Sequence, residues 1–207
     1  MKSVKERVRQ FNLHIKDKYY HLTFDKPASE VMISKIQGYY KTKIPISLRW
    51  FYREIGGITG NSNEFVMNIE NIPYLLKKLN EPNKWFKCDS LGFVDYLRFL
   101  WGNDRPEFES FDPEKIAYLN ENYRCFGHYR FSCGLTEANI LYFDKAGKFG
   151  EVRYHEKEFE NVWTEFLNDM LVASPASEDL EHMLIRILNK LETGAKNRDK
   201  LVLPDLD

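Results

Sequence analysis

Long apolar runs are missing from this chain of 207 residues, although hydrophobic residues make up 43% of it and aromatic residues 15%. A membrane-spanning helix needs about 20 consecutive apolar residues, and no segment approaches that length. The first ten residues are polar and basic and lack the apolar stretch of a secretory signal. We therefore expect a cytoplasmic protein that does not enter a membrane and that has enough apolar side chains for a sizeable core.

Cysteine is scarce as well, with three residues, an odd number that does not suggest a disulfide framework. A reducing compartment is the simplest interpretation. Cys125, His128 and Cys133, with the distant Cys88, are residue types that bind zinc. In an extended strand, however, Cys125 and Cys133 would lie about 26 Å apart and His128 would point to the opposite face, unless Gly127 makes a tight turn. We therefore expect buried cysteines and neither a metal nor another cofactor.

Sequence motifs of the common enzyme classes are also missing. The glycine-rich run at 56–62 is not followed by Gly-Lys-Ser/Thr, so it does not match a phosphate-binding loop. No serine lies in a Gly-x-Ser-x-Gly elbow, and His155 lacks the second histidine of a zinc-protease helix. We predict that the protein is not an enzyme. The alternative is a hydrolase with scattered site residues, which a deep pocket holding a histidine or carboxylate of strongly shifted pKa would favour.

Net charge of either sign is nearly absent, because 30 Lys and Arg balance 31 Asp and Glu. A net charge of −1 gives no general attraction to nucleic acid or to a membrane. The charges are unevenly distributed, since residues 1–45 carry 10 basic against 4 acidic side chains. Two later segments are acidic, 104–121 with a net charge of −4 and 156–181 with −7. Together they could form a surface that steers a basic partner into contact.

The spacing of apolar residues predicts an α+β fold, with a mixed or antiparallel sheet flanked by helices. Helices are expected at 4–15, 29–40, 45–55, 72–79, 90–101, 159–171 and 177–191, with Gly194 ending the last one. Strands are expected at 64–69, 123–133, 140–144 and 150–155, and 57–63 is expected to be a polar loop. We predict one domain over 1–173, with the N-terminal helix at 1–22 as an addition, followed by a C-terminal helix and tail at 174–207.

The most informative segment is 43–57, which reads K-I-P-I-S-L-R-W-F-Y-R-E-I-G-G. Pro45 suits the start of a helix, where its missing N–H is not needed. One apolar stripe follows at helical spacing, formed by Leu48, Phe51, Tyr52 and Ile55. Gly56 and Gly57 are expected to supply the left-handed backbone that ends a helix. The segment therefore predicts a short buried helix with a sharp exit.

This segment resembles the fingerprint of the SUKH superfamily, the SMI/KNR-type domains that are named for a yeast regulator of cell-wall synthesis and are abundant among bacterial toxin-immunity proteins. The matching residues are Ile44, Pro45, Ser47, Leu48, Phe51, Tyr52, Glu54, Gly56 and Gly57. The resemblance extends over 29–171. It implies a non-catalytic α+β module in which the fingerprint is structural, and whose bacterial members neutralise a toxin, often a nuclease or a deaminase, by direct binding.

On this basis we expect an immunity protein that binds a basic toxin and does not itself bind nucleic acid. Acidic mimicry of phosphate is the expected mechanism, because toxins that process nucleic acids tend to carry basic grooves. The candidate contact residues are Glu107, Glu109, Asp112, Glu160, Glu165 and Asp169. The alternative keeps the fold and makes the protein an intracellular scaffold or regulator of cell-envelope or signalling assemblies.

Overall fold

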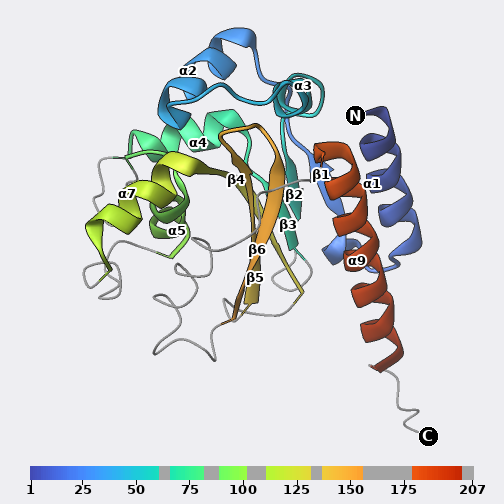
Figure 1. The fold of residues 1–207 in the computed structure, drawn as a ribbon. Helices are drawn as coiled ribbons and strands as arrows, with labels where there is room; N and C mark the ends of the chain where they lie inside the picture. Colours follow the sequence, from blue (N-terminus) through green and yellow to red (C-terminus); the bar gives the residue numbers. More distant parts are fainter. Residues whose placement is uncertain (61–65, 82–88, 102–110, 132–136, 156–178, 202–207) are drawn as a thin grey trace, which may run out of the picture.

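In the part of the chain that the structure describes, six antiparallel strands form one central sheet (Figure 1). The structure is a computed structural model, and it describes residues 1–60, 66–81, 89–101, 111–131, 137–155 and 179–201. The strands lie side by side in the order of the sequence. They are β1 (Leu22–Phe24), β2 (Ile58–Gly60), β3 (Val66–Ile69), β4 (Tyr123–Arg130), β5 (Glu137–Asp144) and β6 (Phe149–His155). The predicted α+β class is confirmed, with an antiparallel sheet.

Helices cover both faces of this sheet and one of its ends (Figure 1). One face carries α4 (Ile72–Leu79), α5 (Phe93–Trp101) and α7 (Pro113–Asn122). The other carries α1 (Lys2–His14) and α9 (Leu180–Leu201), which come from opposite ends of the chain and lie side by side. At one end lie α2 (Glu30–Tyr40) and α3 (Ile46–Glu54), and a short 3₁₀ turn, η1 (Lys18–Tyr20), precedes β1. No helix among the described residues is long and apolar enough to span a membrane.

The fingerprint segment forms a helix, as its spacing predicts. Pro45 is the N-cap residue of α3, and Leu48, Phe51 and Tyr52 on its inner side are fully buried. The Phe51 and Tyr52 rings meet edge to face with their centroids 5.9 Å apart. All three side chains belong to the same hydrophobic cluster as the sheet. The segment therefore contributes directly to the core.

The two glycines after α3 have different roles, and the expectation for Gly57 is wrong. Gly56 has the left-handed backbone that was expected, with φ of 85°, and a Cβ there would lie 2.1 Å from the carbonyl oxygen of Lys26. Gly57 does not have a positive φ. It is constrained by space instead, because a Cβ on Gly57 would lie 2.5 Å from the carboxylate of Asp25 and 2.7 Å from the carbonyl oxygen of Ile69.

Several other element predictions need correction. The expected polar loop at 57–63 contains β2, which pairs with β1 on one side and β3 on the other. The helix α7 was not predicted, and β4 ends at Arg130 rather than at Cys133. The last helix begins at Leu180 and continues through Gly194 to Leu201. Leu191 and Ala195, one turn apart on that helix, are buried, and we attribute its continuation to this packing, which offsets the roughly 1 kcal/mol cost of a helical glycine.

Some predictions concern residues outside the described part of the chain. The helix expected at 159–171 lies there, as do Cys88 and Cys133. The proposed domain boundary between residues 173 and 174 also falls in an undescribed segment, so the division into two parts stays a prediction. What the structure describes is that Val4, Val8 and Phe11 of α1 and Leu184 and Leu188 of α9 are buried in one common cluster.

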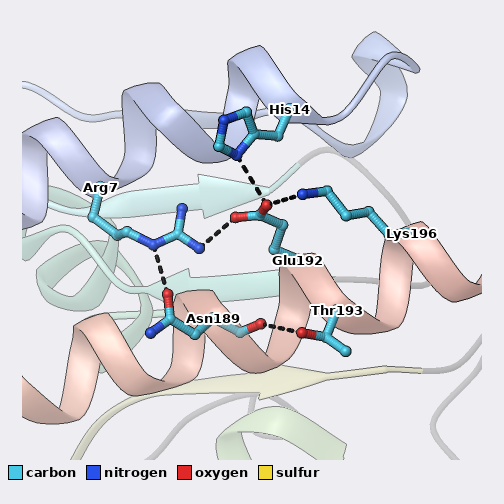
Figure 2. A network of polar contacts seen from close by, with 6 residues as sticks. All are labelled: Arg7, His14, Asn189, Glu192, Thr193 and Lys196. Carbon is cyan, nitrogen blue, oxygen red and sulfur yellow. Dashed lines mark hydrogen bonds and ion pairs between the residues drawn. The ribbon is translucent and has the colours of Figure 1, made fainter.

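A network of charged side chains joins α1 to α9 (Figure 2). The Glu192 carboxylate accepts hydrogen bonds from Arg7 and Lys196, and Nδ1 of His14 lies 2.9 Å from it. Arg7 also donates to the side-chain oxygen of Asn189 at 2.7 Å. Burial alone would raise the pKa of Glu192, but the bonds from Lys196, Arg7 and His14 outweigh burial and hold the pKa at about 2. The two ends of the chain are therefore tied by charge as well as by apolar packing.

Candidate functional site

A polar cavity of about 550 Å³ opens between the sheet and the helices α4 and α5. This volume lies within the range of ordinary ligand pockets. Its polar lining includes Asp25, Thr59, Asn68, Glu70, Tyr74 and His128. The loop after β1, three strands and two helices therefore meet here, and Asp112, the one predicted contact residue that the structure describes, is not part of the lining. Other hollows lie along α9, between α2 and α3, and between α1, α3 and the start of α9. Their described lining residues include no comparable set of buried ionisable groups.

Glu70 is the most unusual group in the cavity. It follows β3 directly, and its side chain is 13% exposed. Its carboxylate lies 3.6 Å from Nδ1 of His128, which is too long for a hydrogen bond. Burial raises the pKa of Glu70 to about 7, and the charge of Asp25 adds to this effect. Near neutral pH, Glu70 is therefore present in both its protonated and its ionised form.

His128 of β4 pairs with Asn68 of β3, and its side chain is as buried as that of Glu70. Its Nδ1 is 3.5 Å from the Tyr96 hydroxyl, and its Nε2 is 3.4 Å from the Asn68 amide nitrogen. Burial lowers the pKa of His128 to about 4, and the charge of Arg130 contributes. The imidazole is therefore neutral at pH 7, so the contact with Glu70 is not an ion pair there.

A β-bulge determines which way His128 points, and it corrects the prediction from strand alternation. The register of β4 against β5 shifts between Cys125 and Gly127. An extra residue on one strand changes the side on which the following residues lie. Cys125 and His128 consequently face the same side, because Tyr96 of α5 is close to both of them. Among the described residues, no three His, Cys, Asp or Glu side chains gather in a way that could hold a metal ion.

Asp25 is held at the cavity by the fingerprint glycines. Its backbone N–H donates to the carbonyl oxygen of Gly57 at 3.1 Å, and the hydroxyl of Thr59 donates to its carboxylate at 3.0 Å. Only a residue without a side chain leaves room for that carboxylate beside Gly57. Gly127 acts in the same way next to His128, because a Cβ there would lie 2.5 Å from the carbonyl oxygen of Asn68. Two close backbone approaches therefore shape the cavity.

The arrangement offers two kinds of chemistry. A carboxyl group that titrates near pH 7 and a neutral imidazole are suited to proton transfer. Two carboxylates beside an aromatic ring are suited to binding a cation. Tyr74 supplies that ring, and its own pKa is raised by burial and by the charge of Glu70.

The predicted acidic contact surface is mostly outside the described residues. Glu107, Glu109, Glu160, Glu165 and Asp169 all lie there, so the acidic surface stays a prediction. Asp112 is described and exposed, and its carboxylate accepts from the backbone N–H of Glu114 at 2.8 Å. This contact makes Asp112 the N-cap of α7.

The cavity residues were not selected from the sequence. Asp25 precedes the helix expected at 29–40, and the N-cap of that helix is Ser29. His128 has only a zinc-ligand interpretation in the sequence, and Glu70 lies one residue beyond the strand expected at 64–69. The sequence feature related to them is Gly57. The backbone of Gly57 does not require glycine, since its φ is not positive, but the nearby carboxylate of Asp25 leaves no room for a side chain.

A scan of protein-family models finds no match to this chain, and searches of curated proteins and of solved structures likewise find no similar protein.

Proposed function

We propose that this protein is a non-catalytic immunity protein that binds and neutralises a basic bacterial toxin, a nuclease or a deaminase. The observation that supports this most is the burial of the fingerprint residues Leu48, Phe51 and Tyr52. The resemblance to the SUKH superfamily implies that this segment has a structural role in a binding module. In this protein the segment is part of the hydrophobic core. The α+β fold that the resemblance implies is also the observed one. Recognition is then left to the surface and to the cavity.

In this proposal the toxin is occluded by carboxylates that take the place of the nucleic-acid phosphates. Attraction between an acidic surface and a basic groove increases the association rate, and salt screens it. Asp112, exposed at the start of α7, is the described member of the proposed contact set. We place the encounter in the cytoplasm, where a toxin that attacks nucleic acid has its substrate.

Co-expression with the product of the neighbouring reading frame tests this proposal. We expect the two proteins to purify together as a stable complex and the neighbour to be toxic when it is expressed alone. A neighbour that is harmless, or that neither binds this protein nor is inhibited by it, would contradict the proposal. Several weakly bound partners in place of one tight partner would instead indicate the scaffold or regulatory role.

A second candidate function is hydrolysis, and the cavity is the observation that favours it. Glu70, with a pKa of about 7, lies 3.6 Å from a neutral His128, an arrangement compatible with a general acid and base. The test is to incubate the purified protein with chromogenic esters, phosphate esters and glycosides. Turnover that is lost in both Glu70→Gln and His128→Asn would establish this function, and no turnover by the parent would remove the support for it.

A further inference from the structure

The carboxylates of the cavity form no ion pair with a described Lys or Arg, although Lys78 also lines the cavity. Asp25 accepts a hydrogen bond from the hydroxyl of Thr59 at 3.0 Å, and no described Lys or Arg forms an ion pair with it. Glu70 accepts no hydrogen bond from a described residue, and its neighbour His128 is neutral at pH 7. Burying a carboxylate without a partner is costly, and a bound cation is one way to offset that cost.

The rest of the cavity is suited to a cation that carries an apolar stem. Phe99 and Leu100 of α5 form an apolar wall, and the Tyr74 ring meets Phe99 edge to face at 6.0 Å. Tyr74 already has a cation over its ring, because the ammonium group of Lys78 lies 5.9 Å from the ring centroid. Aromatic faces attract ammonium and guanidinium groups in this way. A ligand with methylene groups and a charged head would contact both the wall and the carboxylates.

We propose that this cavity binds an organic cation, a guanidinium or primary ammonium group on an alkyl stem, through Asp25 and Glu70, while Lys78 stays over the Tyr74 ring. Asp25 and Glu70 accept hydrogen bonds from the charged head, while Phe99 and Leu100 contact the stem.

Charges of both signs surround Glu70. The ionisable groups near it are Asp25 from the loop after β1, Tyr52 of α3, Tyr74 and Lys78 of α4, Tyr96 of α5, and His128 of β4 with Arg130 beyond it. The tyrosines are neutral at pH 7, and burial raises their pKa values further. His128 is also neutral, because burial lowers its pKa to about 4. Lys78 and Arg130 are the positive charges of this set, and Asp25 and Glu70 are the negative ones. Ionisation of Glu70 makes cation binding tighter as the pH rises through about 7.

The cation has two possible sources. It can be the side chain of a lysine or arginine on a partner protein, and this source rests on the proposed function. It can also be a free alkyl amine or guanidine, which does not. Both have the same head group and stem, so one set of probes tests the site and a separate assay identifies the source.

The site is tested by titrating the protein with n-butylguanidine and n-butylammonium, using calorimetry and amide NMR shifts. The neutral n-butanol and the anionic butyrate are the control ligands. We expect both cations to bind more tightly than the controls, and more tightly at pH 8 than at pH 6. Asp25→Asn and Glu70→Gln should each weaken binding about ten- to hundredfold, as expected for lost hydrogen bonds to a charged group. Asp112→Asn, which changes an exposed carboxylate of α7, should leave binding unchanged.

Equal binding of n-butanol and n-butylammonium, or cation binding that neither cavity variant weakens, would overturn the proposal. Thermal melts of every variant identify a folding defect, and if Asp25→Asn does not fold, the pH dependence of the parent and its loss in Glu70→Gln still decide the matter. The source is decided by repeating the co-purification with both cavity variants. A weakened complex indicates a partner side chain, and an unchanged complex together with weakened probe binding indicates a free cation. A toxin complex without any probe binding would leave the proposed function intact and refute the cation site.

Discussion

Replacing Glu70 with glutamine should stabilise the protein in a manner that depends on pH. Burial and the charge of Asp25 raise the pKa of Glu70 from 4.5 to about 7 in the folded protein. The folded state therefore holds the proton more tightly than the unfolded chain does. The protonated Glu70 therefore stabilises the folded state fully below pH 4.5, and this stabilisation is lost as the pH rises through 7. Glutamine has nearly the same shape and does not ionise, so the Glu70→Gln protein does not lose this stability as the pH rises.

The magnitude follows from the pKa values. A rise from 4.5 to about 7 makes ionisation about 3 kcal/mol less favourable in the folded state than in the unfolded one. Relative to the parent, Glu70→Gln should thus raise the free energy of unfolding by about 3 kcal/mol at pH 8 but by only about 1 kcal/mol at pH 5. His128 has the opposite dependence, because its pKa is lowered from 6.5 to about 4 and its contribution is lost as the pH falls through that range. At pH 8 it is neutral in both states and does not affect the comparison.

Urea denaturation of both proteins at pH 5 and pH 8 measures these differences. The matched control is Glu121→Gln, since the Glu121 side chain is 71% exposed and its ion pair with Lys145 is long, at 4.0 Å. That substitution should change stability by less than about 0.5 kcal/mol at either pH. A Glu70→Gln protein that is equally stabilised at both pH values, or destabilised at pH 8, would show that Glu70 is not held as a buried acid.

Three further predictions concern the fingerprint and the proposed acidic surface. Phe51→Ala should cost about 3–5 kcal/mol because the ring is fully buried, and an unchanged melting temperature would contradict this. Gly57→Ala should destabilise by about 1–3 kcal/mol because its Cβ would lie 2.5 Å from the carboxylate of Asp25, whereas Gly38→Ala, with nothing within 4 Å, should be neutral or stabilising; equal melting temperatures would refute the crowding argument. Replacing Glu160, Glu165 and Asp169 with lysine should slow toxin association and reduce its salt dependence in stopped-flow measurements. An unchanged association rate would contradict the acidic surface.

The helices were predictable where a full apolar stripe is present. In α1 and α3 the buried residues recur at helical spacing over several turns, and both segments form the helices that this spacing predicts. The strands β1 and β2 gave no such signal, because three residues are too few to show alternation. They are strands because they pair with each other, and that pairing joins segments more than thirty residues apart, as in the contact of Leu22 with Gly60.

The site was less predictable than the fold for related reasons. Asp25, Glu70 and His128 come from three separate segments and are brought together only by the sheet and its helices. The side on which His128 lies depends on a bulge, which a rule of strict alternation cannot anticipate. Burial also changes the chemistry of the site, because it shifts the pKa values of Glu70 and His128 towards their uncharged forms. The sequence identifies residue types, whereas these properties arise from tertiary packing.

The pairing of α1 with α9 affects how the chain folds while it is being synthesised. The contact between Arg7 and Glu192 spans 185 residues, so the first helix leaves the ribosome long before its partner. At about 5–20 residues per second, that interval lasts roughly ten to forty seconds. During this time the apolar side of α1, with Val4, Val8 and Phe11, has no α9 to cover it. A chaperone that shields this helix would therefore act early, and translation must pass Glu192 before the contact can form.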